Sequence, residues 1–137
     1  MKKSNNLRTG RHCVFDLHAH LVFVTKYRKN VFTNESLTDL KTILRRVCYD
    51  FGTDLVEFNG ETDHVHLLVN YPSKVSISKL VNSLKGVSSR LLQKSHPSLK
   101  AKYWKGSLWS PSYFAGSCGG ATISLVRKYI ENQKVPD

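Results

Sequence analysis

The stretch "TDHVHLLVNYP", residues 62–72, decides the fold, because its pattern is that of a β-strand with one face in a core. Residues i and i+2 of a strand share a face, so His64 and His66 point the same way while Val65 points into the core. Apolar residues then continue to Val69, which is typical of a strand deep inside a sheet. The sequence therefore predicts a central strand that presents two imidazoles on one face.

The segments around this strand alternate between strand and helix patterns. Thr33 or Asn34 can cap the first helix, Gly52 can end it, and Pro111 favours an edge position for the last strand. This order predicts an α+β fold of the ferredoxin-like or RRM-like type, a mostly antiparallel sheet with helices on it and an appended carboxyl-terminal helix. The predicted strands are at 15–27, 53–60, 64–71 and 107–117, and the predicted helices are at 33–52, 76–97 and 122–133.

The charge of the chain points to a polyanionic partner. Its 137 residues include 21 Lys and Arg against 10 Asp and Glu, and the net charge of +11 is spread along the whole chain. A basic soluble protein without a nucleic-acid role is the alternative. The length fits a single domain over residues 1–137, with residues 1–12 as a flexible arm.

Cysteine usage and hydropathy predict a cytoplasmic protein. Cys13, Cys48 and Cys118 form no CxxC pair, so free thiols are expected. The chain has no run of about eighteen apolar residues, and no membrane partner is expected. Its basic amino terminus also lacks the apolar block of a secretory signal.

Two histidines on one strand face are not yet a metal site, because divalent ions bind about four to six ligands. His64 and His66 can converge on one ion only if a third ligand comes from elsewhere; otherwise they are two solvent-facing polar residues. His18 and His20 have the same spacing on the first predicted strand. Because the strand that carries His64 and His66 is more apolar than the strand that carries His18 and His20, we favour His64 and His66 as ligands. We interpret His18 as a surface residue and His20 as a residue behind the ligands or facing DNA.

The last predicted helix brings two functional groups to one face. Tyr129 and Gln133 are four residues apart in "RKYIENQ" (127–133), so a phenol and an amide lie together on that helix. An apolar stripe that includes Ile130 docks the helix on the rest of the fold. A packed tyrosine beside a solvated glutamine is the simpler interpretation of this spacing alone.

Five segments in one order carry a family resemblance: "TKYR" (25–28), "DHVHLLV" (63–69), "KGVSSR" (85–90), "LWSPSYF" (108–114) and "YIENQ" (129–133). Together they resemble the single-tyrosine HUH transposases of the smallest bacterial and archaeal insertion sequences and their REP-associated relatives. The resemblance covers nearly the whole chain. It implies a DNA strand transferase in which Tyr129 is the nucleophile. It also implies that His64, His66 and Gln133 bind a divalent metal, Mg²⁺ or Mn²⁺.

The resemblance further implies the partners of the protein. The substrate would be single-stranded DNA with hairpins at the transposon ends, cleaved through a 5′-phosphotyrosine intermediate. The protein would act as a homodimer whose sheets join, and the tyrosine helix of one subunit can complete the histidine site of the other. Gly119 and Gly120 precede that helix and are either its hinge or a plain tight turn.

Two basic segments are the predicted DNA-binding surface. In the first, which follows the first strand, an aromatic ring is available to stack on an unpaired base; a solvated turn is the alternative. In the second, a mid-helix glycine lets either another helix or a DNA backbone approach. The residues are Lys26, Tyr27, Arg28 and Lys29 in the first segment, and Lys85, Gly86, Ser89 and Arg90 in the second.

Two other functions compete with the transposase interpretation. A non-catalytic module of the same fold that binds single-stranded or hairpin nucleic acid would need no metal. A metal-dependent hydrolase of small phosphoesters would explain the histidines but not the charge. The sequence contains neither a GxxxxGK[ST] phosphate-binding loop nor the HxE and PCxxC signature of zinc deaminases.

Overall fold

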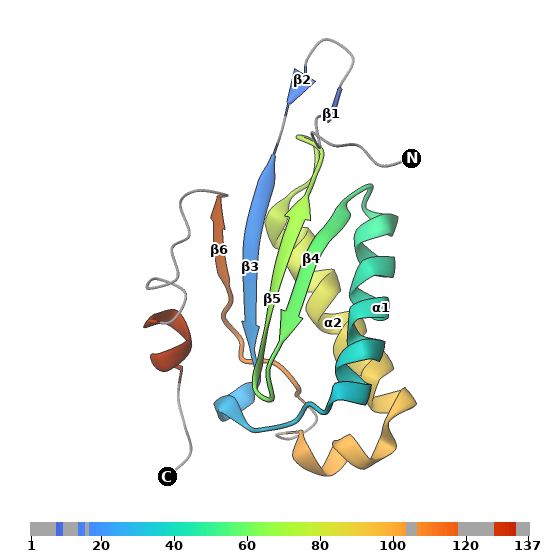
Figure 1. The fold of residues 1–137 in the computed structure, drawn as a ribbon, viewed down its shortest axis with the longest axis vertical. Coiled ribbons are helices and arrows are strands. Elements are labelled where there is room, and N and C mark those ends of the chain that lie inside the picture. The colour runs from blue at the N-terminus through green and yellow to red at the C-terminus, as the bar shows by residue number, and fades with distance from the viewer. Residues whose placement is uncertain (1–7, 10–13, 16, 104–106, 118–127, 134–137) are drawn as a thin grey trace.

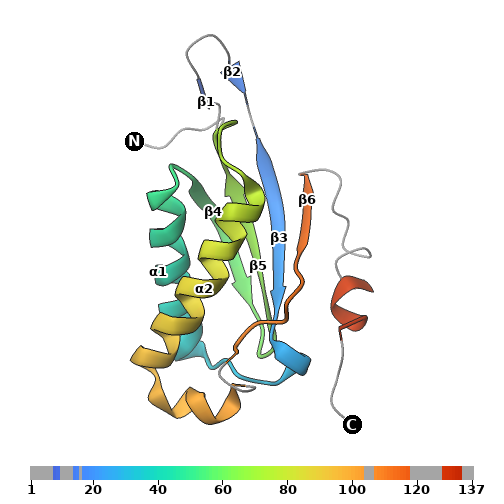
Figure 2. The ribbon, with the colours of Figure 1, turned by 180° about the vertical axis from the view of Figure 1, so that it is seen from behind.

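A computed structural model of the chain describes residues 8–9, 14–15, 17–103, 107–117 and 128–133. Its centre is an antiparallel sheet of four strands in the order β4-β5-β3-β6. The helices α1 and α2 cover one face of this sheet (Figures 1 and 2). This arrangement confirms the predicted α+β fold. The strands are β3 (His18–Val24), β4 (Asp54–Gly60), β5 (His64–Asn70) and β6 (Phe114–Ser117), and the helices are α1 (Asn34–Asp50) and α2 (Ile77–Ser95).

Both helices begin and end where short polar residues and glycine predict it. Thr33 caps α1 through a capping box, in which its hydroxyl accepts from the Ser36 N–H at 3.1 Å and its own N–H donates to the Ser36 hydroxyl at 2.9 Å. Gly52, with a φ of 67°, follows the end of α1. Ser76 caps α2, which ends before Pro97.

The main core lies between the sheet and the two helices. Leu21 and Phe23 of β3 are fully buried there, as are Val65 and Leu67 of β5. Trp109 joins this core, with its ring centroid 5.6 Å from that of Phe23. Trp109 is therefore a core residue, whereas Trp104 lies outside the described residues.

The other face of the sheet carries the histidines. In the register of the sheet, Val22 of β3 pairs with His66 on one side and with Phe114 on the other. Val24 likewise pairs with His64. Because residues directly opposite in an antiparallel sheet share a face, all five side chains lie on the face away from α1 and α2.

Two predicted strands are shorter than expected. The segment predicted as one strand over 15–27 is divided into β2 (Val14–Phe15) and β3, and the chain turns at Thr25 into the short 3₁₀ helix η1 (Lys26–Arg28). Of residues 107–117, only Phe114–Ser117 form a strand, β6, which is at the sheet edge as Pro111 suggested. A second 3₁₀ helix, η2 (Pro97–Lys102), follows α2.

Several other expectations concern the termini and the cysteines. Within the predicted arm 1–12, the structure describes β1 (Arg8–Thr9), which pairs with β2; the rest of the arm lies outside the described residues. Cys48 is a buried free thiol, and burial raises its pKa to about 12. Cys13 and Cys118 lie outside the described residues. None of the described helices is long and apolar enough to span a bilayer.

A buried hydrogen bond between α2 and the segment before β6 allows a test of this packing. The Trp109 indole N–H donates to the Ser88 hydroxyl at 3.0 Å, and both residues are buried. Ser88→Ala would leave the indole N–H without this acceptor, so we expect the free energy of unfolding to fall by about 1–3 kcal/mol. Denaturant unfolding measures this change. Ser95→Ala at the exposed end of α2 is the control, with an expected change within about 0.5 kcal/mol, and equal stabilities of the two variants would contradict the packing.

Candidate active site

Three histidine rings gather on the sheet face away from α1 and α2. The ring centroids of His64 and His66 are 5.0 Å apart. The ring of His20, from the neighbouring strand β3, lies 5.8 Å from that of His66. His18 is separate, with a ring nitrogen 3.2 Å from the side-chain nitrogen of Asn70. The structure thus brings together His64 and His66 and places His20 beside them, whereas the third predicted ligand, Gln133, contacts other residues, which are described below. The strand β3 is as central in the sheet as β5, so its position does not separate the two histidine pairs.

Asp63 holds the His64 ring, a contact that the sequence argument missed. The Asp63 Oδ1 lies 2.8 Å from the His64 Nδ1, and both side chains are largely buried. A carboxylate only accepts hydrogen bonds, so this contact favours hydrogen on Nδ1 and leaves the Nε2 lone pair available. The acidic residue directly before the first histidine in "DHVH" was the available sequence signal.

The histidine pair suits a metal but does not complete a site. Burial, followed by the neighbouring His64 and His20, lowers the pKa of His66 and so favours its neutral, metal-binding form. Among the described residues, no three His, Cys, Asp or Glu side chains form a group that could hold a metal ion. The remaining ligands would have to be of other types, such as an amide oxygen, a phosphate oxygen or water. Two neutral imidazoles and an amide oxygen fit Mg²⁺ or Mn²⁺ with positions left open.

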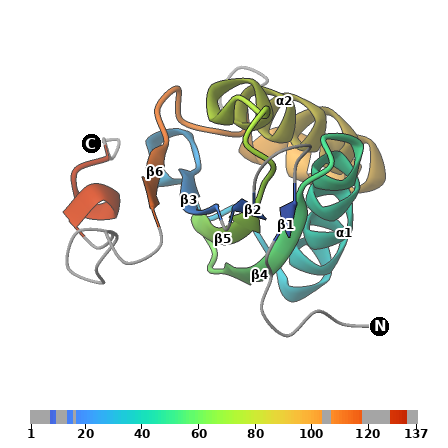
Figure 3. The same ribbon diagram turned by 90° about the horizontal axis from the view of Figure 1, so that it is seen from above.

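Tyr129 and Gln133 lie on the same sheet face as the histidines. Residues 128–131 are helical, next to β6 and away from α1 and α2 (Figures 1 and 3). Tyr129 and Ile130 pack against the buried Val22 and Val24. Since neighbouring strands are about 4.8 Å apart, the β5 backbone that carries the histidines is about 10 Å from β6. Residues 122–127 of the predicted helix, with Gly119 and Gly120, lie outside the described residues.

Two serines before β6 bind both functional side chains. The Ser112 hydroxyl lies 3.0 Å from the Tyr129 hydroxyl, and the Ser110 hydroxyl donates to the Gln133 Oε1 at 3.0 Å. The Gln133 side-chain amide also donates to the Tyr129 carbonyl oxygen at 3.2 Å. Burial raises the pKa of Tyr129, and the hydrogen bond with Ser112 acts in the opposite direction. The phenol and the amide are therefore held as one unit.

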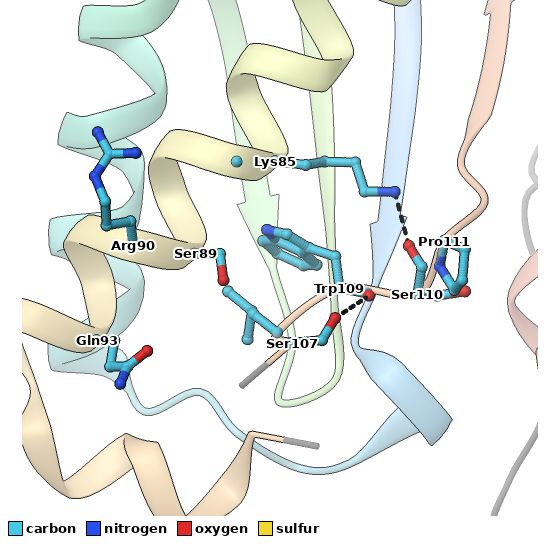
Figure 4. Close-up of a pocket in the computed structure, with 10 residues that line it drawn as sticks. Lys85, Ser89, Arg90, Gln93, Ser107, Trp109, Ser110 and Pro111 are labelled. Atoms are coloured by element: carbon cyan, nitrogen blue, oxygen red, sulfur yellow. Dashed lines mark hydrogen bonds between the residues drawn. The ribbon is translucent and has the colours of Figure 1, made fainter. Parts of the chain in front are cut away.

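Lys85 anchors this serine segment from the other side. Its ammonium donates to the carbonyl oxygen of Ser110 at 2.7 Å (Figure 4) and to that of Ser112 at 3.0 Å. Burial lowers the pKa of Lys85 to about 8. Lys85 was predicted to bind DNA, and this position gives it a structural contact as well.

The predicted DNA-binding residues of α2 line a groove of about 500 Å³ between α2 and residues 107–111 (Figure 4). Besides Lys85, they are Gly86, Ser89 and Arg90. A Cβ at Gly86 would meet nothing within 4 Å, so no other described helix packs there. A second hollow of about 530 Å³ shares Arg90 and continues to Lys94 at the end of α2 and to Lys100 in η2. The groove and the hollow thus form a basic surface along α2.

The other predicted DNA-binding segment is the turn after β3. The Lys26 ammonium lies 5.7 Å from the centroid of the Tyr27 ring, and Lys29 is partly exposed. Tyr27 and Arg28 both have positive φ angles, 58° and 54°. The Arg28 Nε lies 3.5 Å from the Asp63 Oδ2, so Arg28 faces the histidine site.

The chain matches known proteins over most of its length. A family model described as IS200-like transposase matches residues 13–133. The ISDra2 transposase TnpA of Deinococcus radiodurans is 37% identical over 127 residues, which are 93% of this chain and 91% of that protein. A transposase for the insertion sequence element IS200 of Salmonella typhimurium is 32% identical over 126 residues, covering 92% of this chain and 82% of that protein.

Solved structures agree with these matches. A crystal structure of a transposase from Deinococcus radiodurans R1 superposes with a TM-score of 0.86 at 36% identity, covering 94% of this chain and 99% of that one. The structure of a REP-associated tyrosine transposase bound to a REP hairpin superposes with a TM-score of 0.55 at 11% identity, covering 92% of this chain and 70% of that one. The second likeness is one of fold alone.

The Lys85 contacts can be tested by amide hydrogen exchange. Lys85→Met keeps the apolar stem but removes the N–H donors that hold the Ser110 and Ser112 carbonyls. A lost hydrogen bond of about 1 kcal/mol corresponds to about fivefold faster exchange, which we expect in residues 110–117 and 128–133. Lys79→Met on the exposed start of α2 is the matched control. Unchanged exchange in Lys85→Met would show that this lysine does not anchor the segment.

Proposed function

The chain belongs to the family of IS200-like transposases, and we propose that it cleaves and rejoins single-stranded DNA at transposon ends with Tyr129 as the nucleophile. The observation that carries this proposal is the shared sheet face, on which one chain holds both halves of the predicted site. The His64 and His66 rings lie on β5, and the Tyr129 and Gln133 unit lies across β3 from them.

The proposed reaction exchanges one phosphate ester for another. The Tyr129 oxygen attacks the phosphorus, its bond to phosphorus forms, and the bond from phosphorus to the 3′ oxygen breaks. The products are a 5′-phosphotyrosine and a free 3′-hydroxyl, and the reverse step joins another strand. Because burial raises the pKa of Tyr129, the phenol must lose its proton during attack, and the leaving 3′ oxygen takes up one proton to become the hydroxyl, so protons balance. The Ser112 hydroxyl, 3.0 Å from the phenol oxygen, orients it and stabilises its charged form.

A divalent ion, Mg²⁺ or Mn²⁺, would neutralise charge on a non-bridging phosphate oxygen when bound. We propose that His64 and His66 hold it through ring nitrogens and that Gln133 contributes its amide oxygen. In the structure that oxygen accepts from the Ser110 hydroxyl at 3.0 Å and from the Ser112 hydroxyl at 3.4 Å, so binding an ion would replace the longer of these two hydrogen bonds. The lowered pKa of His66 supports this role because the neutral imidazole is the ligand form.

The proposed substrate is single-stranded DNA with hairpin ends. The net charge of +11 and the basic surface along α2 support binding to phosphates. The similarly folded REP-associated transposase binds a REP hairpin, which supports hairpin recognition here. A homodimer with shared active sites remains part of the proposal from the family resemblance. Tyr129 packs against Val22 and Val24 of its own chain, which supports a site completed within one subunit as the alternative to shared sites.

Formation of a covalent adduct tests the nucleophile. With a labelled single-stranded hairpin oligonucleotide and Mg²⁺ or Mn²⁺, we expect a protein–DNA adduct that resists denaturation. Tyr129→Phe lacks the attacking oxygen and should form no adduct while hairpin binding persists. His64→Ala or addition of EDTA should abolish cleavage through loss of the metal.

The control for this experiment is Tyr49→Phe, because Tyr49 is exposed on α1 and far from the site in sequence. It should form the adduct like the wild type. An adduct in Tyr129→Phe would contradict the nucleophile assignment. Hairpin binding without any adduct in the wild type would favour the non-catalytic module.

The salt dependence of hairpin binding tests the basic surface on α2. Arg90 is exposed and lines both the groove and the hollow. If it contacts a phosphate, Arg90→Gln should weaken binding and reduce the slope of log affinity against log salt by about 1. Lys41→Gln removes the same charge from an exposed position on α1 and should leave the slope nearly unchanged. Equal slopes in the two variants would place the DNA elsewhere.

A further inference from the structure

We propose that Asp63 and Arg28 are positioning residues that fix the His64 ring in the form and orientation that binds a metal through Nε2. This inference rests on the proposed metal site. It adds Asp63, which none of the predictions named, and it gives Arg28, which was predicted to bind DNA, a second role. It is carried by a continuous chain of contacts from the strained turn after β3, through a buried carboxylate, to the imidazole.

The first link is the bond between the carboxylate and the imidazole. The Asp63 Oδ1 lies 2.8 Å from the His64 Nδ1, with only 16% and 14% of the two side chains exposed. Because a carboxylate accepts and does not donate, hydrogen is held on Nδ1 and the lone pair is directed to Nε2. Metal-binding histidines commonly have such a partner, which fixes the tautomer and increases the basicity of the ligand.

The second link holds the carboxylate itself. Its other oxygen, Oδ2, forms an ion pair with the Arg28 Nε at 3.5 Å, and the Arg28 side chain is 31% exposed. This Nε is buried and makes no hydrogen bond within the described part of the chain. Arg28 therefore acts on Asp63 through its charge, which balances the buried negative group and restricts its rotation.

The third link is the backbone of the turn, which is strained to bring Arg28 to this place. Tyr27 and Arg28 both adopt left-handed conformations, which cost of order 1–3 kcal/mol each in non-glycine residues. Thr25 ties the turn to β5, because its N–H donates to the Asp63 carbonyl oxygen at 2.9 Å and the Arg28 N–H returns to the Thr25 carbonyl oxygen at 2.8 Å. A turn held in this way places the guanidinium beside Asp63.

A second aspartate–histidine pair in the same protein provides a matched control. The Asp39 Oδ2 lies 2.6 Å from the His96 Nε2, between α1 and the end of α2. Its carboxylate is 49% exposed, against 16% for Asp63. The pair is on the helical side of the sheet, away from the histidine face. Asp39→Asn therefore breaks a similar contact without affecting the proposed site.

The experiment measures Mn²⁺ affinity and the His64 tautomer in the full-length protein. Free Mn²⁺, followed by electron paramagnetic resonance during titration, gives the affinity, and nitrogen-15 NMR of the metal-free protein identifies the ring nitrogen that carries hydrogen. We expect Asp63→Asn to reduce Mn²⁺ affinity by about 10- to 100-fold and to lower the population of the Nδ1–H form. Arg28→Ala should cause a smaller loss, and Arg28→Lys should restore part of it. Thermal unfolding shows whether each variant is folded.

The outcomes separate this inference from the metal site on which it rests. If His64→Ala loses Mn²⁺ while Asp63→Asn and Arg28→Ala bind it like the wild type, the metal site stands and the positioning role is wrong. An unchanged tautomer in Asp63→Asn would also overturn it. If wild-type protein binds no Mn²⁺, the proposed metal site fails and the inference fails with it. Asp39→Asn should match the wild type in both measurements, and an equal loss there would mean that the effect is not specific to Asp63.

Discussion

The register of β3 against its two neighbours is the constraint on which the site depends. Val22 of β3 pairs with His66 of β5 on one side and with Phe114 of β6 on the other. The side chains of His66 and of Phe114, which contacts Tyr129, therefore lie on the same face of the sheet. A slip of β5 by one residue would turn its imidazoles into the core and its buried Val65 to the outside. The apolar core on the helical side therefore fixes the position of polar groups on the other side. The strand register that buries the apolar side chains on one face is the same register that places the histidines on the other.

The segment between Ser107 and Tyr113 connects those two faces. On the helical side, Trp109 is buried against α2 and Lys85 reaches the carbonyl oxygens of Ser110 and Ser112. The hydroxyl groups of the same two serines bind Gln133 and Tyr129. A partly buried ammonium is destabilised by desolvation, as its lowered pKa shows, so its carbonyl partners are needed to hold it there. The basic groove and the Tyr129 phenol consequently share one structural support.

Much of the fold could be predicted because its signals are local. Alternation identified β5, and short polar residues before an apolar periodic stretch narrowed the cap of α1 to Thr33 or Asn34, of which the structure uses Thr33. The ordered motifs likewise led to the transposase family. The contacts that build the site are not local. Lys85 and Ser110 are 25 residues apart, so a single sequence does not reveal their contact. The sequence left two positions open for His20, and only strand pairing shows that it lies beside His66. Asp63 was missed for another reason: its role depends on the rotation of the adjacent ring.

The histidines of the candidate site are held by more contacts than the segment that carries Tyr129. His64 and His66 are on an interior strand, where hydrogen bonds on both edges and the main core restrict the backbone. Tyr129 and Ile130 rest on a small cluster around Val22 and Val24, supported by the two serines. Local opening requires less free energy where little apolar surface is buried. The imidazoles thus lie on the part of the candidate site that more contacts hold, and the phenol lies on the part that fewer described contacts hold. Such a division would suit the proposed role of Tyr129, in which the phenol becomes covalently attached to a DNA strand and must later release it.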